Sequence, residues 1–117
     1  MKTITLVEDD TSIQDVFALA LDPELHKVVV YESGNDILQG NAPVPDLFVL
    51  DKSISGTSGL DVCRFIKSSK KYDHVPVIIM SAAPDLLKVA RDVGANGIIA
   101  KPFSLKNLRE TIFRHTS

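Results

Sequence analysis

The sequence predicts an α/β fold, a doubly wound parallel sheet of five strands with five helices packed on it. Two observations carry this prediction. Short apolar runs, rich in β-branched residues, alternate along the chain with segments in which apolar residues recur at helical spacing. The connections between them are short, and such strict alternation is typical of parallel sheets with right-handed crossovers.

Length and composition favour one small domain. A chain of 117 residues has the size of a single domain, and 44% apolar residues are enough to bury a core, so we expect one domain over residues 1–117. The net charge of −2 gives no electrostatic reason to expect direct binding to nucleic acid or to an anionic membrane. The longest apolar run, residues 16–21, is far shorter than the roughly 18 residues of a spanning helix. With no signal-peptide pattern and a single cysteine, Cys63, we expect a cytoplasmic protein.

The first half of the chain predicts two strands and two helices. Residues 3–7 form the first expected strand. Thr11 is expected to cap the following helix, because Gln14 stands three residues later at capping-box spacing. Residues 27–31 form a second strand, whose flanking charges favour an edge of the sheet, and residues 35–39 leave room only for a short helix.

The middle of the chain predicts a strand buried on both faces. In residues 46–51, four consecutive apolar residues stand between two aspartates, which indicates a fully buried parallel strand. A loop over residues 52–58 follows, and Gly59 opens the third helix, on whose apolar stripe Cys63 is expected to be buried. Residues 77–80 form the fourth strand.

The last third predicts two helices around one strand. Pro84 is expected in the first turn of the fourth helix, which ends at Gly94. Residues 97–100 form the fifth strand, and Ser104 caps the last helix. This helix carries Leu105, Leu108 and Ile112. Five such units in a short chain favour the flavodoxin-like strand order 2-1-3-4-5, which places the ends of the first and third strands side by side.

Chemically useful side chains follow four of the expected strands. Glu8 and Asp9 follow the first strand, and Asp51 ends the third. Ser81 follows the fourth strand and Lys101 the fifth. Because ligands of open α/β sheets bind at the carboxyl ends of the strands, we expect these groups to gather at one site.

Three carboxylates in one place hold too much negative charge, so either one of them is protonated or a cation is bound. Their oxygen atoms suit a hard ion such as Mg²⁺, which readily takes a phosphate oxygen as a further ligand. Lys101 can neutralise one phosphoryl oxygen, and the Ser81 hydroxyl can donate to another. Asp51, alone at the end of its strand, is the candidate nucleophile toward phosphorus.

Each of these residues also has an ordinary structural explanation. The acids after the first strand can cap the next helix, Asp51 and Ser81 can cap turns, and Lys101 can be a surface lysine. The joint occurrence of complementary groups at four strand ends is what favours a functional site.

Over nearly its whole length the chain resembles the receiver domain of two-component response regulators. The resemblance rests on Leu6-Val7-Glu8-Asp9, Asp51, Gly56-Thr57-Ser58-Gly59-Leu60, Ser81-Ala82 and Lys101-Pro102-Phe103. It implies that Asp51 accepts a phosphoryl group from a histidine kinase or a histidine phosphotransfer protein. The domain would catalyse its own phosphorylation and dephosphorylation, and would switch conformation to control a partner or an output domain.

The resemblance also implies roles for individual residues. The Mg²⁺ ligands would be Glu8, Asp9, Asp51 and the main-chain carbonyl of Ser53. Ser81 and Lys101 would contact the phosphoryl oxygens, and the peptide bond between Lys101 and Pro102 would be cis. The fourth helix, the fifth strand and the fifth helix would form the surface for an effector domain or partner protein.

Three features depart from the family's pattern. Ser55 stands where relatives usually have a proline, which loosens the loop after Asp51. Ile98 stands where relatives usually have an aromatic residue, which is thought to turn inward with the hydroxyl at the position of Ser81. The segment from Ser81 to Gly94 is slightly shorter than in relatives, which predicts a trimmed fourth helix or preceding loop.

Two other functions stay open at this point. The chain could be a docking module with a receiver fold that never takes up phosphate, although Asp9, Asp51, Ser81 and Lys101 are all present. It could also be a flavodoxin-like cofactor-binding protein. The acidic loop after the first strand argues against a flavin phosphate, which favours hydroxyls and free main-chain amides.

Overall fold

A computed structural model of the chain describes residues 1–54 and 56–117. Within this part, five parallel strands form the main sheet in the order β2-β1-β3-β6-β7. These strands are β1 (Lys2–Val7), β2 (His26–Tyr31), β3 (Leu47–Asp51), β6 (Val77–Ser81) and β7 (Gly97–Ala100). Because β4 and β5 lie outside this sheet, its order is the predicted 2-1-3-4-5, with the second strand at an edge as expected.

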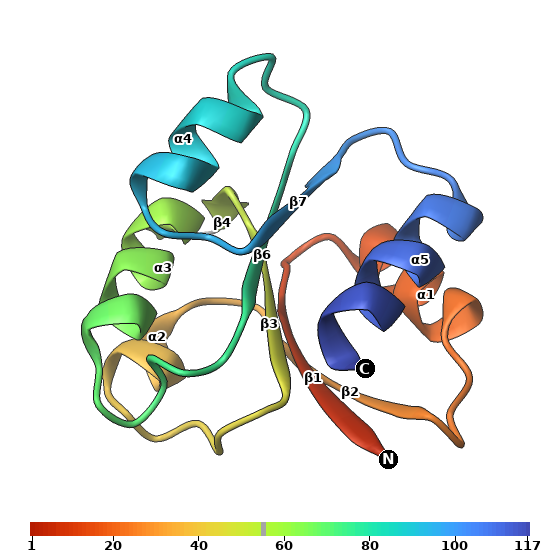
Figure 1. The fold of residues 1–117 in the computed structure, drawn as a ribbon, viewed down its shortest axis with the longest axis horizontal. Helices are drawn as coiled ribbons and strands as arrows, with labels where there is room; N and C mark the ends of the chain where they lie inside the picture. The colour runs from red at the N-terminus through yellow and green to blue at the C-terminus, as the bar shows by residue number, and fades with distance from the viewer. Residues whose placement is uncertain (55) are drawn as a thin grey trace.

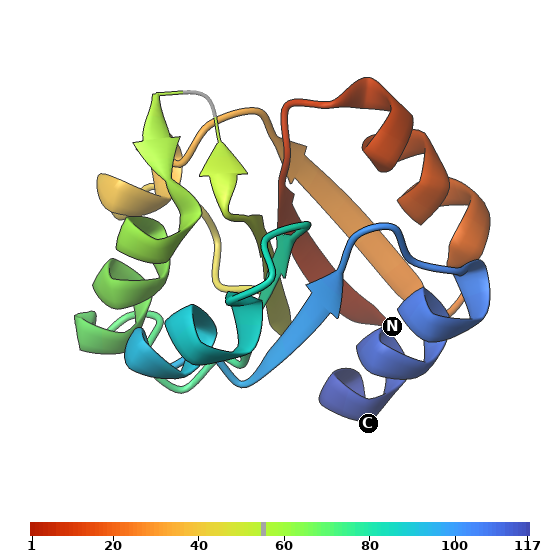
Figure 2. The same ribbon diagram turned by 90° about the horizontal axis from the view of Figure 1, so that it is seen from above.

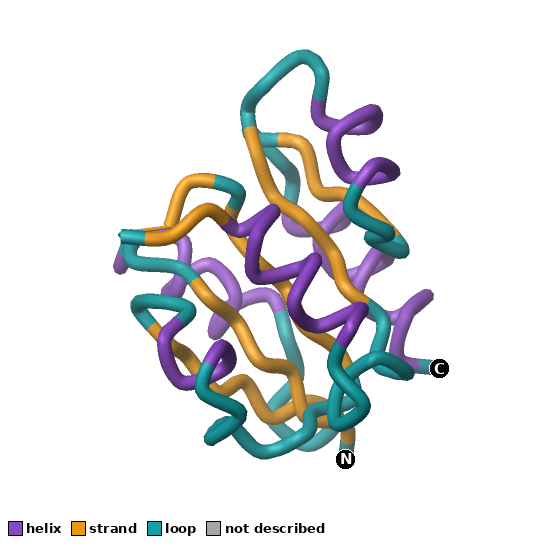
Figure 3. Tube along the Cα trace, turned by 90° about the vertical axis from the view of Figure 1, so that its left-hand side faces the viewer, coloured by secondary structure: helices purple, strands orange, loops and turns teal. Residues whose placement is uncertain are grey.

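Helices cover both faces of the sheet (Figure 1). On one face lie α1 (Thr11–Ala20) and α5 (Leu105–Thr116). On the other lie α2 (Asn35–Leu38), α3 (Gly59–Ser68) and α4 (Leu86–Asp92), with α3 crossing the middle of the sheet in Figure 3. Among the described residues, no helix is both long and apolar enough to cross a bilayer. This is the doubly wound architecture that the alternation of strands and helices predicts.

The sheet separates two apolar cores, and β3 contributes to both of them. All five residues of β3 are buried. Leu47 and Val49 pack with the residues of α1 and α5, whereas Phe48 and Leu50 pack on the other face with α3, including the buried Cys63. A strand between two cores has no polar face, which explains its uninterrupted apolar run.

The segment expected to be a plain loop contains two short strands. β4 (Ser53–Ile54) and β5 (Thr57–Ser58) pair antiparallel beside the main sheet (Figure 2). The sequence could not predict them, because two-residue strands are too short to show a periodicity. Ser55, the position at which relatives usually have a proline, lies outside the described residues.

The N-cap of α1 is Asp10, so the assignment of Thr11 was wrong. The Asp10 side chain accepts a hydrogen bond from the main-chain N–H of Ser12 at 2.8 Å. The Gln14 side chain donates instead to the main-chain oxygen of Glu8, also at 2.8 Å. Aspartate and threonine are both preferred caps, so residue type alone did not decide between adjacent positions.

The last two helices confirm the predicted Gly94 and Ser104 caps and correct the placement of Pro84. α4 has only seven residues, in keeping with a trimmed helix, and Gly94 beyond its end has the expected left-handed conformation, with φ of 81°. Pro84 precedes this helix and does not lie in its first turn. Ser104 caps α5, as predicted, by accepting from Asn107 N at 3.0 Å. Leu105, the first residue of α5, is 42% exposed.

Candidate functional site

The polar groups at the strand ends meet at one edge of the sheet, onto which Figure 2 looks. The register of the strands aligns these ends. Val7 of β1 pairs with Leu50 of β3, Asp51 pairs with Met80 of β6, and Ser81 pairs with Ala100 of β7. The residues that follow each strand therefore emerge side by side, as the sequence predicts.

Asp51 is held at the end of the central strand by main-chain contacts. It is 7% exposed, and the Ser53 N–H donates to its Oδ1 at 3.3 Å. The backbone of Gly59, at the start of α3, lies against the backbone of Asp51 and Lys52, and Gly59 N donates to Lys52 O at 2.9 Å. A Cβ atom on residue 59 would overlap the Asp51 carbonyl oxygen, so the approach of α3 to the site requires glycine.

Lys101 reaches two of the acids. Its Nζ lies 3.2 Å from Asp51 Oδ2 and 3.3 Å from Glu8 Oε1. The Lys101 main-chain N–H donates to Ser81 O at 2.9 Å, which anchors the turn after β7. The peptide bond between Lys101 and Pro102 is cis, as the resemblance implies.

Glu8, Asp9 and Asp51 form the acidic cluster of the site. One carboxylate oxygen of each lies within 4.8 Å of the others. Glu8 is completely buried, and Asp9 is exposed. Burial, a hydrogen bond with Asp51 and repulsion by its charge raise the pKa of Glu8 to about 7, although Lys101 opposes the shift. Near neutral pH, Glu8 is therefore protonated in part of the molecules.

The charge of Lys101 responds to the same acids. Burial alone would lower the pKa of Lys101, but Asp51 and Glu8 together raise it above its usual value. Lys101 is thus a fixed positive charge at the site, and it leaves at least one negative charge of the cluster unbalanced.

The acidic cluster fits a hard divalent cation. Its donors are carboxylate oxygens, and Asp9 is open to solvent, so an ion there can keep several waters. Glu8 is oriented by the N–H of Asp10, which donates to its Oε2 at 3.3 Å. The geometry therefore suits Mg²⁺ better than a soft metal, which would require sulfur or imidazole ligands.

Ser81 and Ser53 occupy the predicted edge. Ser81 is 8% exposed, and its Oγ accepts a hydrogen bond from Ala83 N at 3.0 Å. Because this contact uses an oxygen lone pair, the hydroxyl proton can be donated to a ligand. Ser53 lies in β4, directly after Asp51 and Lys52, and the metal-binding role of its carbonyl stays a prediction.

Two features of the site could not be predicted from the sequence. One is the contact of Gly59 with the Asp51 backbone, for which the only sequence signal is a glycine at the start of a helix. The other is the Gln14 side chain, which holds the loop after β1 through the Glu8 carbonyl.

Comparisons with known proteins find similar sequences over most of the chain. A family model described as the response regulator receiver domain matches residues 4–113. The transcriptional regulatory protein AfsQ1 of Streptomyces coelicolor is 34% identical over 105 residues, which cover 87% of this chain and 45% of AfsQ1. The chain thus spans about half the length of the curated relatives it matches.

Solved structures share the fold over almost the whole chain. A response regulator structure from Chloroflexus aurantiacus has a TM-score of 0.88 at 24% identity and covers 98% of this chain and 97% of that one. The receiver domain of a Pseudomonas aeruginosa sensor histidine kinase has a TM-score of 0.83 at 23% identity, with coverages of 98% and 97%. That structure has a magnesium ion coordinated in its active-site cleft.

Proposed function

Because the chain belongs to the response regulator receiver domain family, we propose that Asp51 is its phosphoryl acceptor. Signalling by phosphorylation in a two-component system is the function of this family. The observation that best supports the choice of Asp51 is its environment. Its buried carboxylate lies at the end of the central strand, 3.2 Å from Lys101 Nζ and within 4.8 Å of the other two acids.

The proposed reaction is an in-line transfer. An Asp51 oxygen attacks the phosphorus of a phosphohistidine, so that an O–P bond forms as the P–N bond breaks and the histidine leaves. Lys101, already paired with Asp51, neutralises a phosphoryl oxygen, and Ser81 donates its hydroxyl proton to another. Water later hydrolyses the acyl phosphate, so the domain catalyses both its phosphorylation and its dephosphorylation.

The proposed cofactor is Mg²⁺, and the magnesium-containing Pseudomonas receiver domain supports this choice. Its proposed ligands are Glu8, Asp9, Asp51 and the main-chain carbonyl of Ser53. When bound, the ion supplies positive charge that offsets the acids and the phosphoryl oxygens. Since Glu8 is partly protonated near neutral pH, protons and the metal compete for the cluster.

The proposed phosphoryl donor is a histidine kinase or a histidine phosphotransfer protein. The proposed output is an effector domain or partner protein that binds the face formed by α4, β7 and α5. We assign no direct nucleic-acid binding to residues 1–117, and the expected cytoplasmic location belongs to the same proposal. The curated relatives are transcriptional regulators about twice as long as this chain, which supports an output in a further domain.

Labelling tests the proposal directly. The chain is incubated with acetyl phosphate and Mg²⁺, and the adduct is measured by intact mass spectrometry and located by peptide mapping. We expect one phosphoryl group on Asp51, and none on Asp51→Asn, which keeps the shape of the side chain and a cooperative unfolding transition. Asp61→Asn is the matched control, because Asp61 lies on the exposed surface of α3 and should leave labelling unchanged.

Two results would contradict the assignment. Stoichiometric labelling of Asp51→Asn at another residue would show that Asp51 is not the acceptor. A folded wild-type chain that takes up neither acetyl phosphate nor beryllofluoride would favour the docking module.

A further inference from the structure

An ion pair joins two loops beside the proposed phosphoryl site. One loop begins with Lys52, directly after Asp51, and the other leads from Ser81 to α4. Lys52 Nζ lies 4.0 Å from Oδ1 of Asp85, the residue before α4. Apart from the pairs of Lys101, the other ion pairs among the described residues join positions at most four apart in the sequence. The Lys52–Asp85 pair therefore connects segments that only the fold brings together.

The main chain of Lys52 is fixed on both sides. Its N–H donates to Met80 O of β6 at 2.9 Å, and its carbonyl oxygen accepts from Gly59 N at 2.9 Å. The Lys52 side chain is 27% exposed, so most of it is covered by neighbouring residues. A lysine on a fixed main chain with a largely covered stem loses little conformational freedom on pairing, so it can hold a second loop in place.

The Asp85 carboxylate is free to form this pair. Asp85 occupies the N-cap position of α4, where an aspartate normally accepts a hydrogen bond from a main-chain N–H of the first turn. Its side chain makes no such capping bond. Within residues 1–54 and 56–117, the charged partner of this carboxylate is Lys52. The start of α4 is thus tied to the loop after Asp51 and not capped by its own aspartate.

The segment that ends at Asp85 is short and carries Ser81 at its other end. Only residues 82–84 separate the two. Ala83 N donates to Ser81 Oγ at 3.0 Å, so the main chain of this segment contacts the hydroxyl that is proposed to bind a phosphoryl oxygen. Leu86 N donates in turn to Ala83 O at 3.2 Å. A displacement of Asp85 would therefore be passed through Ala83 to the Ser81 hydroxyl.

We propose that Lys52 is a positioning residue of the phosphoryl site. Through Asp85 it holds residues 82–85 and so keeps the Ser81 hydroxyl aimed at the phosphoryl group on Asp51. A donor that is already in place when the group arrives requires no rearrangement during transfer, which makes the transfer faster. This inference rests on the proposed function, in which Asp51 accepts the group and Ser81 contacts it.

Two substitutions separate this role from simple attraction of an anionic phosphoryl donor. If the pair positions the segment, removal of either charge breaks it, so Lys52→Gln and Asp85→Asn both slow phosphoryl uptake. If Lys52 only attracts the donor by its charge, Lys52→Gln slows uptake, whereas Asp85→Asn removes a negative charge beside the site and speeds it. The direction of the Asp85→Asn effect therefore decides between the two roles.

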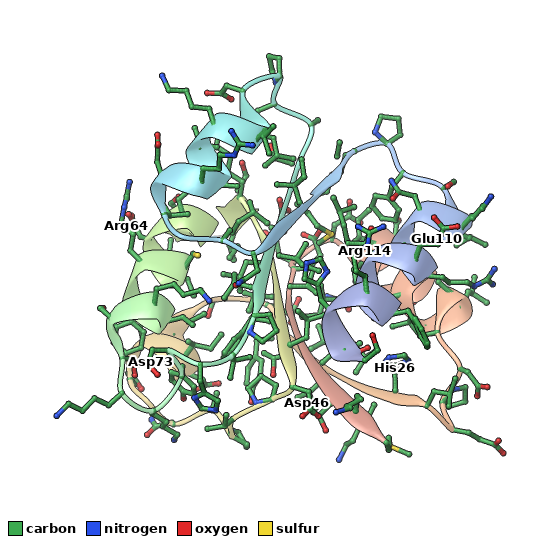
Figure 4. All side chains as sticks on the ribbon, viewed as in Figure 1. His26, Asp46, Arg64, Asp73, Glu110 and Arg114 are labelled. Atoms are coloured by element: carbon green, nitrogen blue, oxygen red, sulfur yellow. The ribbon has the colours of Figure 1, made fainter. Side chains whose placement is uncertain are left out.

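Acetyl phosphate labelling of Asp51, at fixed Mg²⁺ and ionic strength, measures these rates by intact mass spectrometry. We expect Lys52→Gln and Asp85→Asn each to slow labelling about two- to five-fold, the effect of losing a partly exposed ion pair. The matched control is Arg64→Gln, which removes the same charge from the exposed pair of Arg64 and Asp61 on α3. Arg64 points outward from α3 in Figure 4, and its replacement should leave the rate unchanged.

A double substitution tests whether Lys52 acts through Ser81. Ser81→Ala should itself slow labelling, and Lys52→Gln should add no further loss in that background. An Asp85→Asn rate equal to or above that of the wild type, or a full further loss in the Ser81→Ala background, would overturn the positioning role. Both results require labelling of the wild type at Asp51. A folded wild type that takes up no phosphoryl group would instead refute the proposed acceptor, and this inference with it.

Discussion

Glu8 is a carboxyl group without solvent contact, and its protonation affects the stability of the fold. In the folded chain its pKa is about 7, whereas its ordinary value is 4.5. Between these values the folded state holds a proton that the unfolded chain has released. Because the folded state then binds more protons, the free energy of unfolding decreases as the pH rises.

We expect Glu8 to lower the free energy of unfolding by up to about 3 kcal/mol between pH 4.5 and pH 7, in the absence of Mg²⁺. Urea denaturation at several pH values, with a chelator present, measures this change for the wild type and for Glu8→Gln. The difference between the two proteins isolates Glu8. His26, whose pKa is lowered mainly by burial, contributes the opposite slope equally to both. Parallel pH profiles would contradict the prediction.

Gly59 determines how closely α3 approaches the phosphoryl acceptor. Gly59→Ala places a methyl group on the backbone of Asp51 and Lys52, and neither backbone can move without displacing the site. We expect a loss of about 3 kcal/mol in the free energy of unfolding and slower acetyl phosphate labelling of Asp51. Urea denaturation and labelling kinetics measure the two effects.

Gly40→Ala is the control for this substitution. Unlike Gly59, Gly40 has a positive φ of 73°, and a Cβ atom there would meet no atom within 4 Å. Gly40→Ala should lower the free energy of unfolding by only about 1–2 kcal/mol, from backbone conformation alone. Labelling of Asp51 should be unchanged. If both variants label at the wild-type rate, contact of Gly59 with Asp51 does not position the acceptor.

At the scale of the elements, substitutions at the start of α1 test the assignment of Asp10 as its N-cap. Asp10→Ala removes the acceptor for the Ser12 N–H and should lower the free energy of unfolding by about 1 kcal/mol. Thr11→Ala, one residue later and inside the helix, should change it by less than about 0.5 kcal/mol. Urea denaturation compares the two variants. A larger loss for Thr11→Ala would support the original assignment of the cap.

Elements were predictable where their pattern reflects burial. The run from Leu47 to Leu50 is apolar because the strand lies between two cores, so its sequence alone indicates a central strand. By contrast, β4 and β5 form through the pairing of Ser53 with Ser58, which no local periodicity reveals. The exposure of Leu105 likewise depends on how α5 packs, because an apolar residue in the first turn can face either way.

At the scale of the whole molecule, the sheet topology predicts which residues meet but not their environments. Asp51 ends β3 and Lys101 follows β7, so the parallel sheet places both at one edge. β6 lies between the two strands, and the long Lys101 side chain spans this gap to reach Asp51. The complete burial of Glu8 and the contact of Gly59 arise from the packing of whole elements, which sequence spacing does not encode.

Communication from the phosphoryl site to the face formed by α4, β7 and α5 is a property of the whole molecule. Ile98 is half-buried, packs on the core beside α4 and borders a hollow of about 250 Å³ with Leu87 and Ala90. It lacks a polar end that would favour a second, solvated position. We therefore expect Ser81 and the loop after it, and not Ile98, to transmit phosphorylation to α4.

Beryllofluoride titrations followed by amide NMR test this route. We expect the wild type and Ile98→Val to show shifts at the site and in α4, because Val keeps the packing. Ser81→Ala should bind beryllofluoride but lose most of the shifts in α4, because it lacks the hydroxyl that donates to the bound group. The reverse result, in which the amide shifts of α4 persist in Ser81→Ala and are lost in Ile98→Val, would refute the mechanism.

The wide spacing of the site along the chain has a consequence for its synthesis. Glu8 and its partner Lys101 are 93 positions apart, and Asp51 and Lys101 are 50 apart. The ribosome therefore synthesises the three acids well before Lys101 and before β7, the strand that Lys101 follows. The nascent chain passes through a stage in which the acids are present without the Lys101 ammonium. The site can form completely only after β7, the last strand of the sheet along the chain, has been translated.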